Sequence, residues 1–341
     1  MAKKIGKSTI LMEQKPIVFS FGAIVSEKEG KGPLASHFDI ISKDPMFGES
    51  SWEKAESMMQ KQIINHVLDK ANMTPKDIDF LFAGDLLNQC TGTSYGVKDF
   101  SIPFCGLYGA CSTMAESLSM ASIFVDANIA RKCLAMTSSH FCSAEKQYRF
   151  PVQYGSQRTP TAQWTVTGSG AIIIVENKKQ NQDQDNIYVE AVTIGTIEDL
   201  GITDVNNMGA AMAPAAADTI LNYFNDTGDD PSSFDMIITG DLGYVGSDIL
   251  LDLLKKQDMD ISKNHTDCGK LIFNREPQDV HSGGSGCGCS ASVLCSYIFK
   301  NMKNKNIKKI LFIATGALMS PTSIKQGQSI PCIAHLVKLT I

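Results

Sequence analysis

The chain has 341 residues, of which 43% are hydrophobic and 20% charged, as in a globular protein with a large core. Its net charge of −5 argues against a nucleic-acid-binding protein. The N-terminus lacks the apolar stretch of a signal peptide. The best apolar run, from Ile310 to Met319, is far shorter than the roughly 20 residues that a membrane-spanning helix needs. We therefore expect a soluble protein whose cysteines are reduced thiols.

The elements predicted in the first part of the chain alternate between strands and helices. Residues 17–25 have a strand-like pattern, and residues 51–71 form an amphipathic helix with Ser51 at its cap. A buried strand then ends in a Gly84-Asp85 turn, and a Gly-rich loop leads through Cys111 into another helix. Two further buried strands are predicted, at 131–140 and 168–175, and the second of them closes this part of the chain.

The second part of the chain repeats this order. The segment from Pro75 to Leu86 recurs from Pro231 to Leu242, with Pro, Asp, Gly, Asp and Leu at one fixed offset. Downstream, Cys287 opens a helix from a Gly-rich loop as Cys111 does, and a basic pair again precedes a buried strand. We interpret the chain as a duplicated α/β fold with two pseudo-equivalent halves, because strands and helices alternate in both. The two halves are predicted at 1–180 and 187–341. The second half also contains predicted strands at 187–197 and 330–339 and a predicted helix at 209–224.

Cys111 is the first candidate for chemistry. A thiol at a helix N-terminus feels the positive end of the helix dipole, which lowers the thiol pKa and favours the reactive thiolate. This position suits an acyl-accepting nucleophile. The alternative is that Cys111 is only a small buried hydrophobic residue, as most free cysteines are.

The duplicated α/β order and the stretch Gly109-Ala-Cys111-Ser-Thr-Met-Ala-Glu-Ser-Leu resemble the thiolase superfamily, which includes thiolases, ketoacyl synthases and related condensing enzymes. The resemblance implies a thiolase-like, five-layer αβαβα fold. Four stretches are similar to a sporulation branch of that superfamily: 104–111, 138–142, 147–165 and 280–291. This second resemblance implies non-catalytic binding of dipicolinic acid (pyridine-2,6-dicarboxylate), for its transport into the forespore and its release at germination.

The resemblance also implies two partners that a condensing enzyme needs beside the cysteine. One is a His in the turn after the strand at 237–239, and the other is a His or Asn at the Gly-rich start of the second-half helix. Neither is present in the turns at 239–246 and 284–289. Asp241, in the first of these turns, would instead repel a developing oxyanion and raise the Cys111 pKa. We therefore predict a binding protein rather than an enzyme.

Two other functions stay open. The first is an acyltransferase or 3-oxoacyl-ACP synthase-like condensing enzyme that uses Cys111, with His281 reaching the thiol from a displaced position. The second is a structural component whose pocket is vestigial. In either case Asp85 and Asp241 are expected to hold their turns through local backbone hydrogen bonds.

A flat aromatic dianion is bound best by Arg guanidinium groups and by backbone N–H groups at helix starts, which bind its carboxylates. Aromatic side chains can pack on the two faces of its ring. Two of only four arginines, Arg149 and Arg158, lie in the aromatic segment 141–167, where the superfamily has a substrate-lining segment. Alternatively, the arginines form surface ion pairs and Trp164 belongs to the core. The predicted ligand-binding residues are Cys111, His140, Arg149, Arg158, Trp164, Thr165, His281, Ser285 and Cys287.

The expected partners follow from the same resemblance. They are dipicolinic acid, other membrane subunits of a spore transport complex, and a second copy of the chain in a homodimer formed through the closing region of the first half. No cofactor is expected, and Ca²⁺ is considered only as an ion that accompanies the ligand. No metal site is expected, because Cys287 and Cys289 lack a second Cys/His pair at ligand spacing. The expected location is the cytoplasm or forespore, peripheral on the spore inner membrane, without a transmembrane helix.

Overall fold

The computed structural model describes residues 1–148, 158–178 and 185–341. The elements of the first half are β1 (Lys3–Ile5), β2 (Thr9–Leu11), β3 (Ile17–Ser26), β4 (Ile40–Ser42), α1 (Trp52–Lys70), β5 (Phe80–Gly84), α2 (Thr91–Val97), β6 (Phe104–Gly106), α3 (Thr113–Asp126), β7 (Lys132–Ser139), α4 (Phe141–Tyr148), β8 (Trp164–Thr165) and β9 (Gly168–Val175). Those of the second half are β10 (Ile187–Thr193), α5 (Met208–Thr227), β11 (Met236–Thr239), α6 (Gly243–Lys255), β12 (His265–Asp267), α7 (Cys268–Leu271), β13 (Gly284–Ser285), α8 (Cys287–Val293), α9 (Phe299–Lys303), β14 (Lys309–Ala317), α10 (Pro321–Lys325) and β15 (Cys332–Thr340).

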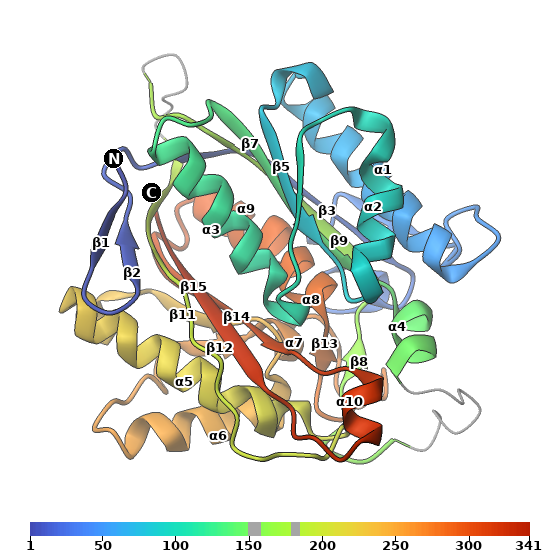
Figure 1. Ribbon diagram of the computed structural model, residues 1–341, viewed down its shortest axis with the longest axis vertical. Helices are drawn as coiled ribbons and strands as arrows, with labels where there is room; N and C mark the ends of the chain where they lie inside the picture. Colours follow the sequence, from blue (N-terminus) through green and yellow to red (C-terminus); the bar gives the residue numbers. More distant parts are fainter. Residues whose placement is uncertain (149–157, 179–184) are drawn as a thin grey trace.

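The strand order repeats in mirror image about the centre of the main sheet. In the described residues the order is β12-β11-β14-β15-β10-β3-β9-β7-β5-β6. Figure 1 shows β3, β5, β7 and β9 of the first half and β14 and β15 of the second half. In each half the two outermost pairings are parallel and the next two are antiparallel. The halves join where β10 pairs with β3, at Ile187 opposite Val18 and Tyr188 opposite Ile17. This arrangement is what an internal duplication predicts.

The duplication extends to individual hydrogen bonds. Asp79 Oδ2 accepts from the backbone N–H groups of Arg131 and Lys132, at 2.7 and 3.0 Å. Asp235 Oδ2 accepts from those of Lys308 and Lys309 at the same two distances. In both halves an Asp before one strand therefore fixes the start of the neighbouring strand, which explains why this Asp and the basic pair recur in the sequence.

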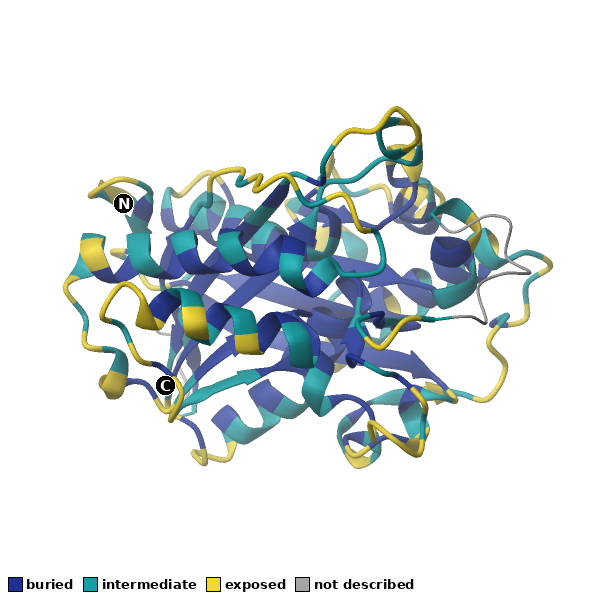
Figure 2. Cartoon of the chain, turned by 90° about the horizontal axis from the view of Figure 1, so that it is seen from below, coloured by how far each residue is buried: buried dark blue, intermediate teal, exposed yellow. Residues whose placement is uncertain are grey.

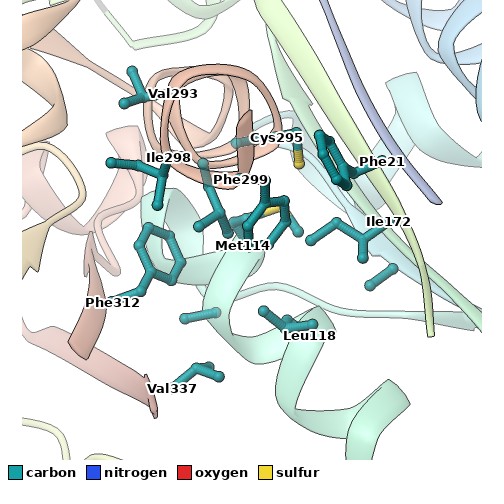
Figure 3. Packing of buried hydrophobic residues seen from close by; sticks show 14 of the residues in the cluster. Phe21, Met114, Leu118, Ile172, Val293, Cys295, Ile298, Phe299, Phe312 and Val337 are labelled. Carbon is teal, nitrogen blue, oxygen red and sulfur yellow. The ribbon is translucent and has the colours of Figure 1, made fainter. Parts of the chain in front are cut away.

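Three buried clusters define the layers. The central cluster packs α3 and the helical run 287–303 between strands of both halves (Figure 3). A second cluster lies between the first-half strands and α1, and a third between the second-half strands and α5 and α6. Neighbouring strand residues alternate between clusters: Ile172 and Phe312 face the centre, whereas Ile173 and Ile313 face outward. The strands are thus buried on both faces (Figure 2), as the predicted five-layer αβαβα fold requires.

Most predicted elements are confirmed, and two details differ. Ser51 does cap α1, because its side chain accepts from Lys54 N–H. The helix predicted to open at Cys111 begins only at Thr113, after a single 3₁₀ turn formed by Ala110–Ser112. The closing strand of the first half, β9, pairs with both β3 and β7, so it has no free edge for a second copy. The division into two domains stays a prediction, since the central cluster contains residues of both halves.

No helix within the described part of the chain combines the length and the apolar character needed to cross a membrane.

Candidate functional site

The turn that carries Cys111 is held in an unusual backbone conformation. Ala110 has a φ of 49°, in the left-handed region that favours glycine. The end of β14 packs directly against this turn, because a Cβ added to Gly316 would lie 2.0 Å from the Gly109 carbonyl oxygen. Only glycine fits there. The end of β14, from the second half, is thus in close contact with the turn of the first half that carries Cys111.

Asp241 lies under this turn and is fully buried. Its Oδ2 accepts from Gly286 N–H at 2.9 Å, and its Oδ1 accepts from the Thr315 hydroxyl at 2.8 Å. The Ser285 hydroxyl is a third donor, at 3.3 Å from Oδ2. The Cys111 thiol interacts with this carboxyl group as well, and the two groups shift each other's pKa. The prediction of a local turn cap is therefore wrong for Asp241, whose donors Ser285, Gly286 and Thr315 lie in β13, at the start of α8 and in β14. It is correct for Asp85, which accepts from Leu87 N–H two residues later.

The electrostatics around Cys111 disfavour a thiolate. Burial, the negative charge of Asp241 and the hydrogen bond to that carboxyl group raise the pKa of the Cys111 thiol well above its usual value. Burial likewise raises the pKa of Asp241, to about 6, although its hydrogen bonds oppose the rise. The expectation of a thiol activated by a helix dipole is therefore wrong, whereas the predicted effect of Asp241 on the thiol is confirmed.

A pocket of about 70 Å³ opens beside Cys111. The first half contributes α4 and the turns before α2 and α3, and the second half contributes the start of α5 and the chain around the end of β14. The lining residues are Leu86, Ala110, Cys111, Ala144, Glu145, Tyr148, Thr165, Val205, Met208, Met212, Ser285, Ala317 and Met319. Cys111, Thr165 and Ser285 were predicted for the site. Cys287 lies directly beneath, packed with Ala110 and Cys111 and donating its thiol to the Ala110 carbonyl.

The start of α8 offers fewer anion donors than expected. Gly286 N–H is bonded to Asp241, and Gly288 N–H is bonded to the Ser139 hydroxyl. These two groups are therefore not available to a ligand carboxylate, so the start of α8 supplies fewer of the backbone N–H groups that an aromatic dianion requires.

A short two-stranded sheet, in which β8 pairs with β13, separates the predicted residues that line the pocket from those that do not. Successive residues of a strand face opposite sides. Thr165 faces the pocket, whereas the Trp164 ring stacks on Phe141, with ring centroids 4.0 Å apart. Lys28 Nζ and Arg158 Cζ lie 3.7 and 4.8 Å from the centre of the Trp164 ring.

We call the group of Lys28, Phe141, Arg158 and Trp164 the Trp164 cluster. Arg158 and His281 lie at this cluster and not in the pocket. Arg158 forms an ion pair with Asp279 at 2.7 Å, and His281 Nε2 lies 3.1 Å from the same carboxylate. His140 is buried, and its Nε2 lies 2.8 Å from the Pro45 carbonyl oxygen. None of these residues lines the pocket beside Cys111. Arg149 lies outside the described residues, so its role stays a prediction.

Several pocket residues were not predicted. Tyr148 is held by hydrogen bonds to the Leu86 carbonyl and to the Tyr108 hydroxyl. Its place in a segment similar to the sporulation branch was a usable signal. Met208, Met212 and Met319 had no such signal, because only the tertiary fold brings the start of α5 and the chain after β14 to Cys111.

Comparisons with known proteins place this geometry in a class. Crystal structures of 3-oxoacyl-[acyl-carrier-protein] synthase III from Aquifex aeolicus and of cerulenin-bound OleA from Xanthomonas campestris match with TM-scores of 0.54 and 0.58. Their identities are 12% and 11%, and the matches cover 96% of this chain and 100% and 97% of theirs. The chain therefore has the predicted thiolase-like fold of condensing enzymes.

Within that class the chain belongs to the family Stage V sporulation protein AD, whose sequence profile matches residues 6–340. It is 45% identical over 333 residues to the Stage V sporulation protein AD of Bacillus subtilis (strain 168), covering 98% of this chain and 96% of that protein. The predicted membership of a sporulation branch is thereby confirmed.

Proposed function

We propose that this sporulation protein binds dipicolinic acid in the pocket beside Cys111 and releases it chemically unchanged. It acts as a peripheral subunit of a transport complex in the spore inner membrane, serving uptake into the forespore and release at germination. The observation that carries the absence of catalysis is the buried Asp241 carboxyl group, whose negative charge raises the pKa of the Cys111 thiol. A nucleophile that must lose its proton beside a carboxylate is poorly suited to acyl transfer.

The charge of the pocket bears on the form of the ligand. Among the described lining residues there is no Lys, Arg or His. A free dianion would therefore meet no cationic side chain among these residues. The Ca²⁺ chelate of dipicolinate carries its own countercharge and meets the hydroxyl groups of Thr165 and Ser285. We therefore take the chelate as the bound form, with Arg149 as the other predicted source of positive charge.

Calorimetric titration of the full chain with dipicolinate tests this function. We expect saturable binding that is tighter with Ca²⁺ than with a chelator. Ala317→Phe puts a ring into the pocket and should weaken binding at least about tenfold, or about 1.4 kcal/mol. Arg158→Ala is the control, because Arg158 lies against Trp164 and Asp279, outside the pocket. No saturable binding would contradict the proposal. Equal losses of affinity in both variants would place the ligand at the Trp164 cluster instead of in the pocket.

A condensing enzyme is the second candidate, favoured by the strained Ala110 that precedes Cys111. It requires that acyl-CoA increase the mass of the peptide containing Cys111, and that Cys111→Ala abolish this increase. We expect no increase, because Asp241 keeps the proton on sulfur. A clear label on Cys111 would favour the enzyme.

We also propose a homodimer formed through β6, the edge strand of the first half. All three residues of β6 are exposed, and Phe104 and Tyr108 are exposed aromatic residues beside this edge. An unpaired edge offers backbone groups to a second copy. Light scattering should give the dimer mass for the wild type and a monomer for Phe104→Lys. Ile129→Lys, at an exposed site elsewhere, should stay dimeric, and a monomeric wild type would refute the interface.

A further inference from the structure

Three of the residues that line the pocket are methionines, which we name the thioether wall. Met208 and Met212 lie one turn apart at the start of α5, and Met319 follows β14. Residues four apart lie on the same face of a helix, so the two α5 side chains extend toward the pocket together. Val205 and Ala317 add further apolar atoms on this second-half side of the lining, and Ser285 adds a hydroxyl group.

Tyr148, on the first-half side of the pocket, is held much more firmly. Its hydroxyl donates to the Leu86 carbonyl and is bonded to the Tyr108 hydroxyl at 2.9 Å. The Tyr148 ring is therefore a fixed surface of the pocket.

The pocket has to widen before it can hold a six-membered ring. Its volume is about 70 Å³, whereas a protein cavity of about 150 Å³ is known to hold benzene. Methionine is unbranched and has three rotatable side-chain bonds, so it adapts to a new shape at little cost. Met212 is almost fully buried, whereas Met208 and Met319 are partly exposed and have room to turn. The thioether wall is thus the adjustable side of the pocket.

We infer that the ligand's aromatic ring lies between the Tyr148 ring and the thioether wall, and that this wall selects a flat aromatic diacid over a saturated one. The inference rests on the proposed function, because it concerns the same pocket. Sulfur makes favourable contacts with aromatic rings that it does not make with saturated rings. The polar groups of the pocket hold the carboxylates in either case, so the preference for aromaticity comes from the three methionines.

The test uses the full chain labelled with ¹³C at the methionine methyl groups. The spectrum is followed during titration with dipicolinate and Ca²⁺, and separately with cis-piperidine-2,6-dicarboxylate, which has the same two carboxylates on a saturated ring. Met208→Leu, Met212→Leu and Met319→Leu assign the signals and conserve apolar volume. We expect ring-current shifts of these methyl signals with dipicolinate and much smaller changes with the saturated diacid.

The triple Leu variant supplies the energetic readout. Its affinity for dipicolinate should fall about three- to tenfold, from the loss of sulfur–aromatic contacts. Its affinity for the saturated diacid should change less than about twofold. Saturable dipicolinate binding that Ala317→Phe weakens, but that leaves these three signals unshifted, would overturn the inference and leave the proposed function standing. Absence of any saturable binding would overturn both.

Discussion

Replacing Asp241 with Asn is expected to make the Cys111 thiol at least about ten times more reactive toward iodoacetamide near neutral pH. The carboxylate disfavours the thiolate by its charge and by its hydrogen bond to the thiol. An amide of the same shape removes the charge, and a fall of one pKa unit, about 1.4 kcal/mol, gives about tenfold more thiolate. Burial still raises the thiol pKa in the variant, so we expect faster alkylation without acyl transfer.

Alkylation rates from peptide mass mapping measure this effect at Cys111 separately from the other cysteines. Asp85→Asn is the matched control, because Asp85 occupies the equivalent Gly-Asp turn of the first half and bonds to Leu87 and Thr93 there. Its alkylation rate at Cys111 should stay near the wild-type value. If Asp241→Asn left the Cys111 rate unchanged, burial alone would control the thiol, and the argument against catalysis would lose its main support.

The sequence was sufficient for the fold because the signals were local and occurred twice. Asp79 and Asp235 each precede a buried strand, and each bonds to the basic pair that begins the neighbouring strand. A recurring Asp, Gly-Asp turn and basic pair therefore reported a recurring structure. Continuous apolar strands also indicated burial on both faces, which the alternation of Ile172 and Ile173 between two clusters confirms.

The site was harder to predict because position along the chain does not determine the direction of a side chain. Trp164 and Thr165 are neighbours, yet only Thr165 lines the pocket, because β8 turns adjacent residues to opposite sides. Arg158 lies over the Trp164 ring, outside the pocket, and forms an ion pair with Asp279. Asp241 shows the same limit, since its equivalent, Asp85, caps its own turn while Asp241 bonds across the two halves.

Gly316→Ala should affect both stability and the site. The new Cβ would lie 2.0 Å from the Gly109 carbonyl oxygen and 3.0 Å from Ser112 N, and both atoms belong to the backbone. Neither can rotate away, so β14 or the turn that carries Cys111 has to move. We expect the free energy of unfolding to fall by about 1–3 kcal/mol, as in other overpacked cores. Urea unfolding measures this loss.

The displaced turn should also weaken ligand binding, because Ala110 and Cys111 line the pocket. Gly106→Ala is the control, and light scattering checks that it keeps the wild-type mass, because Gly106 lies in β6. A Cβ there would meet only the tip of the exposed Phe104 ring, at 3.3 Å, and should change stability by less than about 0.5 kcal/mol. Wild-type stability and dipicolinate affinity in Gly316→Ala would show that β14 and the cysteine turn can separate without cost. The second half would then not fix the geometry of the pocket, and the contact between Asp241 and Cys111 would be incidental.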